Sequence, residues 1–166
     1  MARRGHRGTV VSAGGRLVDP LTRLGAEHAA LPVDRKSLRS MWRCVAPVAE
    51  RIRRGEVDLV HARSRVPGWI GYAASRRAGI PFLTTCHGFY TPHPASAVMA
   101  WGRLIIVPSQ ALGRYIIDRF GAPPERVRVI PRGVDLAEFT RRAAPPPRVG
   151  ARPWRIGLIG RITPIK

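Results

Sequence analysis

The sequence has few acidic side chains and almost no lysine. It contains 10 Asp and Glu residues against 29 Lys and Arg residues, and because Lys36 and Lys166 are its only lysines, 27 of the cations are arginine. The formal charge is +19. Three interpretations stay open: a compositional bias on solvated faces, attraction to an anionic membrane or a phosphorylated substrate, and nucleic-acid binding. We favour nucleic acid least, because the sequence shows no basic tail and no basic patch interleaved with aromatic residues.

Cysteines and long apolar runs are also scarce. Cys44 and Cys86 lie in unrelated segments without metal-ligand spacing, so we expect two buried reduced thiols and no metal site. The first apolar run, residues 9–12, follows a basic start and is far too short for a signal sequence or a membrane span. A cytoplasmic location is therefore the expectation.

Short apolar runs alternate with segments of helical periodicity, which is typical of a parallel sheet covered by crossover helices. The predicted fold class is α/β, a Rossmann-like parallel sheet. One predicted helix runs from Ser37 to Gly55, with an apolar face made of Leu38, Met41, Trp42, Val45, Ala49 and Ile52. Two more cover residues 67–78 and 109–120. Strands are predicted at residues 9–12, 28–33, 59–62, 82–85, 104–107, 127–130 and 155–159.

Composition divides the chain into three parts. Residues 1–140 form the predicted α/β domain, and its opening segment, residues 2–6, is typical of the last turn of a helix rather than of a free start. Residues 141–153 contain a proline-rich stretch without periodicity, which indicates an interdomain linker. Residues 154–166 then read as the first strand and loop of a second domain, whose other strands would have to pair with it.

Ligands of open parallel sheets bind at the carboxyl ends of the strands, so the residues that follow the predicted strands are the site candidates. His87 and Gly88 follow one strand, and His87 is either an acid, base or hydrogen-bond donor to a ligand or a histidine bonded to a loop carbonyl. Arg63 and Ser64 follow another strand, at the start of a helix, where Arg63 binds an anion or is only solvated.

Two further loops supply candidates. Arg132 and Gly133 lie in a turn that is either structural or part of a cleft. In the last loop, Gly160 would let the backbone approach a diphosphate that Arg161 and Lys166 neutralise from two sides.

Five segments in order resemble family 4 glycosyltransferases, which are retaining enzymes of the GT-B fold. They are residues 58–63 (DLVHAR), 79–88 (GIPFLTTCHG), 106–109 (IVPS), 124–135 (PERVRVIPRGVD) and 160–166 (GRITPIK). The resemblance implies two Rossmann-like domains that face a cleft, of which this chain would supply the N-terminal, acceptor-side domain. The partners implied are a nucleotide-sugar donor, UDP- or GDP-linked, and a glycan or lipid-linked acceptor of the cell envelope.

The resemblance also implies roles for individual residues. His87 would contact the transferred sugar or the donor phosphate, and Arg161 and Lys166 would hold the donor diphosphate in a reaction that retains configuration and needs no metal or other cofactor. Family members begin with a further strand and continue with a complete donor domain, so residues 1–166 alone are expected to be inactive. For a lipid-linked acceptor, peripheral contact with the inner face of the membrane is expected.

The alternative is a basic Rossmann-like module that binds anionic membrane or nucleic acid without catalysis. A dinucleotide-dependent oxidoreductase is not expected, because no Gly-x-Gly-x-x-Gly motif follows a strand.

Overall fold

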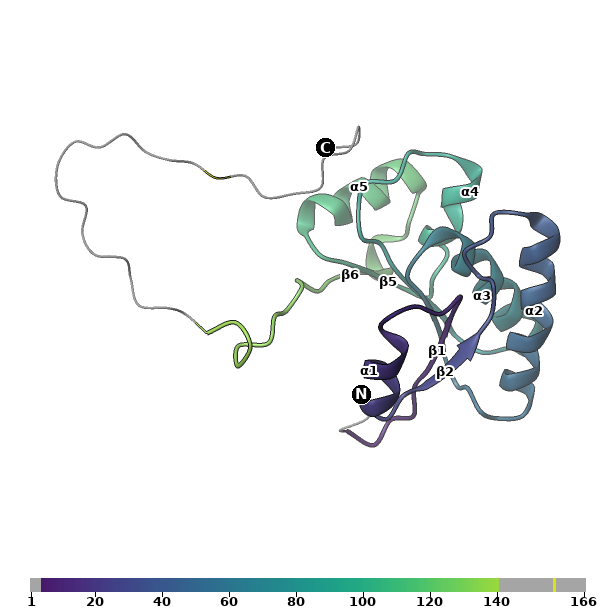
Figure 1. Ribbon diagram of the computed structural model, residues 1–166. Helices are drawn as coiled ribbons and strands as arrows, with labels where there is room; N and C mark the ends of the chain where they lie inside the picture. Colours follow the sequence, from purple (N-terminus) through teal and green to yellow (C-terminus); the bar gives the residue numbers. More distant parts are fainter. Residues whose placement is uncertain (1–3, 141–156, 158–166) are drawn as a thin grey trace, which may run out of the picture. The chain divides into compact units, whose positions relative to one another are not determined.

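The computed structural model describes residues 4–140 and residue 157 (Figure 1). The chain divides into two units, Met1–Arg132 and Gly133–Lys166, and the secondary structure given below belongs to the first. In the second unit, the backbone N–H of Ala137 donates to the Asp135 carboxylate across 2.9 Å. The predicted linker and the predicted strand at residues 155–159 fall outside the described residues, Gly157 excepted.

The described strands form two parallel sheets rather than the one expected. The first pairs β1 (Thr9–Ser12) with β2 (Glu27–Ala30), and the second has the order β3-β4-β5-β6. Its strands are β3 (Val60–Ala62), β4 (Phe82–Thr85), β5 (Leu104–Val107) and β6 (Val127–Val129). After β2 the chain runs through a helix and returns as β3 beside β4, so β1 and β3 do not pair with each other.

The helices confirm the predicted crossover pattern. They are α2 (Leu38–Arg53), α3 (Arg65–Ala78) and α5 (Gln110–Phe120), with the shorter α1 (Val18–Arg23) and α4 (Pro94–Ala97) and the 3₁₀ turns η2 (Val98–Ala100) and η3 (Pro124–Arg126). The Ser109 side chain accepts from the Leu112 N–H across 3.3 Å and caps α5, which ends at Gly121 in the left-handed conformation.

Several predicted boundaries were wrong. The strand predicted at residues 28–33 ends at Ala30, because Pro32 has no N–H to donate to a neighbouring strand. The helix predicted from Pro67 already begins at Arg65, since proline is tolerated throughout the first helical turn. The short helices α1 and α4 were not predicted, because they are too short to show a helical period.

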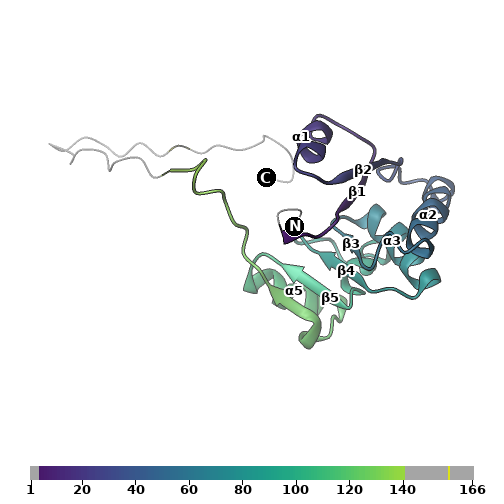
Figure 2. The same cartoon turned by 90° about the horizontal axis from the view of Figure 1, so that it is seen from below.

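The buried apolar residues of the described part of the chain form two clusters. One contains buried residues of α2 and α3, among them Val45, Ile52 and Ala74, with Val11 of β1 and Val60 of β3 packed against it. The other joins β4 and β5 to α5 and includes Ile105 and Ile116, which are fully buried. Figures 1 and 2 show α2 and α3 side by side, with α5 at the opposite end of the larger sheet.

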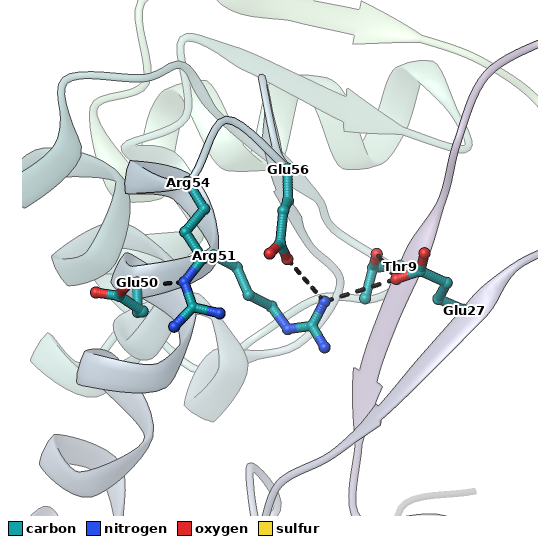
Figure 3. Close-up of polar contacts among 6 residues, drawn as sticks. All are labelled: Thr9, Glu27, Glu50, Arg51, Arg54 and Glu56. Carbon is teal, nitrogen blue, oxygen red and sulfur yellow. Dashed lines mark hydrogen bonds and ion pairs between the residues drawn. The ribbon is translucent and has the colours of Figure 1, made fainter.

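Polar contacts link the smaller sheet to α2 (Figure 3). Arg51 lies 3.1 Å from the Glu56 carboxylate and 3.6 Å from that of Glu27, which also accepts from the Thr9 hydroxyl across 3.2 Å. Glu50 pairs with Arg53 and Arg54, three and four residues further along the helix. The arginines at the C-terminal end of α2 are therefore paired with carboxylates of α2 itself, of β2 and of the turn after α2. None of the helices in the described part of the chain is long and apolar enough to cross a membrane.

Candidate functional site

A cavity of about 500 Å³ opens at the carboxyl ends of the larger sheet. The residues that line it belong to the ends of the four strands β3 to β6 and to the turns that follow them. They are His61, Arg63, Thr85, His87, Ile106, Pro108, Ile130 and Arg132. Because the strands are parallel, segments as far apart in the sequence as β3 and β6 converge at this edge.

His87 lies between two arginines. Arg63, which follows β3, donates from Nε to His87 Nε2 across 3.2 Å. Arg132, which follows β6, brings a terminal guanidinium nitrogen within 3.3 Å of His87 Nδ1 and 3.4 Å of the His87 backbone oxygen. The structure thus brings together three of the predicted candidates, which the sequence separates by 24 and 45 residues.

The two contacts cannot both be hydrogen bonds to the ring at once. A neutral imidazole has one acceptor nitrogen and one N–H, so only one arginine can donate to the ring in either tautomer. When Nε2 accepts from Arg63, Nδ1 carries the proton and Arg132 is left with the His87 carbonyl oxygen as its acceptor. The guanidinium of Arg132 therefore retains N–H donors for an anion in the cavity.

Burial is the largest cause that lowers the pKa of His87, and the charges of Arg63 and Arg132 and the nearby His61 lower this pKa further. A proton on the ring would place a third positive charge between two guanidinium groups. The neutral imidazole is consequently favoured near neutral pH, and an anion bound beside it would oppose the effect of the arginines.

His61 and Thr85 form a pair that the sequence did not single out. The His61 Nε2 and Thr85 Oγ1 atoms lie 2.7 Å apart across β3 and β4. Burial lowers the pKa of His61, with a smaller contribution from the charge of Arg63. His61 lies within β3 rather than after it. Only its spacing of two residues from Arg63, which follows β3, could have indicated that both face the same cavity.

The remaining candidates lie elsewhere or are not described. Ser64 is the N-cap of α3, where its carbonyl oxygen accepts from the Gly68 N–H across 2.8 Å. Gly88 follows His87 but does not line the cavity, and Gly133 belongs to the second unit. Gly160, Arg161 and Lys166 fall outside the described residues.

Among the residues that the structure describes, the lining contains two guanidinium groups, two imidazoles and one hydroxyl, and no carboxylate. Such a site attracts anions. The two guanidinium groups carry positive charge and only donate hydrogen bonds, and the only acceptors among these side chains are one nitrogen of each neutral imidazole and the hydroxyl oxygen. Across the described residues there is no cluster of three or more His, Cys, Asp or Glu side chains that could hold a metal ion. The arrangement is suited to hold a phosphate or a sugar hydroxyl beside His87.

Comparisons with known proteins identify the family of the chain. The model of Glycosyltransferase Family 4 matches residues 1–138. D-inositol 3-phosphate glycosyltransferase of Salinispora arenicola is 27% identical over 139 residues, which cover 68% of this chain and 31% of that protein. The enzyme of the same name from Thermobispora bispora is 30% identical over 138 residues with the same coverage. The chain therefore spans about a third of the length of these curated relatives.

Solved structures give the same result for the fold. A glycosyltransferase from Rickettsia africae ESF-5 is 27% identical, with a TM-score of 0.73 over 84% of this chain and 38% of that protein. Anabaena HepE, solved with UDP-glucose, superposes with a TM-score of 0.63 over 78% of this chain and 37% of that protein. At 22% identity the HepE comparison supports the fold alone. The α/β, Rossmann-like fold of GT-B glycosyltransferases predicted from the sequence is confirmed.

Proposed function

The chain belongs to glycosyltransferase family 4, and from that membership we propose that it is the acceptor-side part of an enzyme that transfers a sugar from a nucleotide-sugar donor to a phosphate-bearing acceptor. The observation that carries this proposal is the position of His87 between Arg63 and Arg132 in a cavity without a carboxylate. An arginine pair binds phosphate well, because guanidinium groups donate several N–H bonds in a fixed plane.

Each residue of the cavity has a distinct part in this proposal. Arg132, with donors to spare, holds the phosphate of the acceptor or of the donor. With its acceptor nitrogen Nε2 occupied by Arg63, the neutral ring of His87 donates its Nδ1–H to a hydroxyl of the transferred sugar. Arg63 positions the imidazole by donating to Nε2. Arg63 is thus a positioning residue for His87.

The proposal extends to residues outside the described part of the chain. Arg161 and Lys166, next to Gly160, hold the donor diphosphate and stabilise the charge that develops on the departing nucleotide. Transfer proceeds with retention of configuration and without a metal ion. Because the chain spans about a third of its curated relatives, residues 1–166 alone have little or no transfer activity in this proposal.

The curated relatives are named for an inositol 3-phosphate substrate, which supports a phosphorylated acceptor here. A lipid-linked glycan precursor of the cell envelope has the same chemical feature, since its sugar is attached through phosphate. The enzyme would then work in the cytoplasm, at the inner face of the cell membrane, where a cytoplasmic donor meets a membrane-bound acceptor.

A fusion protein tests the function. Residues 1–153 are joined in frame to the donor-binding half of the Salinispora arenicola relative, and release of nucleoside diphosphate from UDP- and GDP-sugars is measured with inositol phosphate and with lipid-linked phosphorylated acceptors. We expect turnover by the fusion and none by residues 1–166. His87→Ala should lower kcat at least about a hundredfold, as loss of a group that moves a proton or orients the reacting sugar does.

The matched control is Arg114→Ala, which changes an exposed residue of α5 outside the cavity. This variant should keep the turnover of the parent fusion. Equal turnover of the parent fusion and His87→Ala would contradict the role proposed for His87.

A further inference from the structure

The two halves of α2 differ in how their apolar residues are covered. In the C-terminal half, Val45, Ala49 and Ile52 are buried in the core that α2 shares with α3. In the N-terminal half, the side chains of Leu38 and Trp42 are 73% and 64% exposed, although the sequence predicted that both share the buried face. The apolar face of the helix therefore continues beyond the region that the described residues cover.

The charges of the two halves differ in the same way. Near the C-terminal end of α2, Arg51 is paired with Glu27 and Glu56, and Arg54 with Glu50 (Figure 3). Arg53 is also paired with Glu50. Within the described part of the chain, no ion pair is formed by the four exposed cations at the other end, Arg35, Lys36, Arg39 and Arg43. Asp34 is the one carboxylate in residues 34–43, so four cations and one anion give this segment a net charge of +3.

Helical spacing places the apolar and cationic residues in neighbouring rows. Leu38 and Trp42 are four residues apart and lie within about 40° of each other around the axis, and Arg39 and Arg43 form the adjacent i, i+4 row. We call the group of Arg35, Lys36, Leu38, Arg39, Trp42 and Arg43 the α2 entry surface. It combines an indole and an aliphatic side chain with cations that have no carboxylate partner among the described residues.

We propose that the α2 entry surface docks on an anionic lipid membrane. At a bilayer surface, Trp42 and Leu38 can insert at the boundary between headgroups and acyl chains, while the guanidinium groups bind lipid phosphates. Each cation near an anionic leaflet adds to the attraction, and the contribution is screened by salt. A nucleic-acid duplex would engage the cations but would leave Leu38 and Trp42 exposed to water, so a lipid surface accounts for more of the observations.

The choice of a membrane-bound partner rests on the proposed function, in which the acceptor is attached to lipid. The surface consists of α2 residues together with Arg35 and Lys36, which precede the helix, and it contains no residue of the cavity. Vesicle binding is measured without a sugar donor or acceptor. A negative result for vesicle binding can therefore be distinguished from a negative result for sugar transfer. Loss of sugar transfer in the fusion test leaves the docking surface standing, and absence of vesicle binding leaves the cavity assignment standing.

Co-sedimentation of residues 1–166 with vesicles tests the surface. Vesicles of phosphatidylcholine alone are compared with vesicles that also contain phosphatidylglycerol, at low and at physiological salt. We expect binding to the anionic vesicles only, weaker at the higher salt. The Arg39→Glu/Arg43→Glu variant should weaken this binding about tenfold or more, because two attractions become repulsions. Leu38→Ser/Trp42→Ser should also weaken it, because the apolar contact with the acyl chains is lost.

Two control variants change the same side-chain types elsewhere. Arg114→Glu/Arg119→Glu alters two exposed arginines of α5 and changes the net charge by the same amount. Leu17→Ser/Leu24→Ser removes two leucines that are 72% and 65% exposed beside α1. Both controls should bind vesicles like the unmodified chain. Circular dichroism of all four variants verifies that each is folded before its binding is compared.

Three results would overturn the proposal. The first is a loss of vesicle binding in the α5 control as large as the loss in the α2 variants. This result would show that binding depends on the total charge of the chain. The second is the absence of binding to anionic vesicles. The third is binding to duplex DNA that the α2 variants abolish while vesicle binding is unchanged, which would make this surface a nucleic-acid site.

Discussion

The guanidinium of Arg63 donates to the imidazole of His87 across 3.2 Å, and this contact connects the carboxyl end of β3 to that of β4. The same arginine is the second cause, after burial, that lowers the pKa of His87. One side chain therefore contributes both to the orientation of the histidine and to the lowering of its pKa. The two effects can be separated by substitution, because lysine keeps the charge of Arg63 without its planar array of N–H donors.

We expect Arg63→Gln to raise the pKa of His87, since it removes a positive charge that opposes protonation of the ring. Arg63→Lys should leave this pKa closer to that of the unmodified chain. The measurement is an NMR titration of the His87 Cε1–H resonance, assigned by its loss in His87→Gln. Arg114→Gln, outside the cavity, is the control and should not change the titration. A His87 pKa that falls or stays constant in Arg63→Gln would contradict the assignment.

The lowered pKa values of His61 and His87 also predict how stability depends on pH. In the unfolded chain both histidines titrate at their ordinary pKa, so below that value the unfolded state binds more protons than the folded state. The stability that the folded state gains from its two neutral histidines is therefore present above the unfolded-state pKa. It is lost as the pH falls through the lower folded-state pKa values. The free energy of unfolding should therefore decrease as the pH is lowered from about 7.5 to about 5.5, a range above the ordinary carboxylate pKa values.

Urea unfolding followed by circular dichroism measures this dependence. The double variant His61→Gln/His87→Gln should lose less stability than the unmodified chain over the same pH range, because its two amides do not titrate. His6→Gln is the control, since His6 is exposed and does not line the cavity. Equal pH dependence in the unmodified chain and in His61→Gln/His87→Gln would show that these histidines do not couple to folding.

Gly102 permits a close approach of backbone segments at the start of β5. A Cβ atom added there would lie 2.6 Å from the Leu104 carbonyl oxygen and 2.9 Å from the Thr84 hydroxyl oxygen. Gly102→Ala should therefore lower the free energy of unfolding by about 1–3 kcal/mol, the usual cost of forcing an extra methyl group into a packed site. Gly88→Ala is the control, because a Cβ at Gly88 has no atom within 4 Å. Chemical unfolding at constant pH compares the two variants, and similar stabilities would contradict the close packing.

Much of this fold can be read from the sequence, because its signals are local. The capping serine and closing glycine of α5 lie beside the helix that they delimit, and the apolar run of β5 is short and continuous. The site candidates Arg63, His87 and Arg132 follow from their positions after strands. A pattern of this kind predicts which edge of a sheet the residues share.

The sequence does not reveal the contacts themselves. The 3.3 Å approach of Arg132 to His87 depends on the order of β3 to β6 within one sheet, which only the assembled chain determines. The exposure of Leu38 and Trp42 was also not predicted, because helical periodicity identifies an apolar face and does not show how far a neighbour covers it. The pair formed by His61 and Thr85 was missed because it joins two neighbouring strands, and the order of the strands follows only from the assembled sheet.

Inorganic phosphate should bind in the cavity and raise the pKa of His87. An anion next to the imidazole stabilises the protonated ring and opposes the positive charges of Arg63 and Arg132, which lower this pKa in the free chain. By linkage, an anion of constant charge should bind more tightly at the lower pH, where the ring is protonated. Because phosphate itself loses negative charge as the pH falls, this pH dependence is measured with sulfate, which keeps its charge over the range. The free guanidinium donors of Arg132 make it the main anion ligand, so Arg132→Ala should weaken phosphate binding about tenfold or more, as loss of a hydrogen-bonded charge pair does.

Titration of the His87 resonance with phosphate, and then with inositol phosphate, measures both the change in the His87 pKa and the affinity for the anion. The control Arg114→Ala should bind phosphate like the unmodified chain. A phosphate response that persists unchanged in Arg132→Ala but is lost in Arg114→Ala would place the anion on α5 and remove the cavity from the proposed reaction.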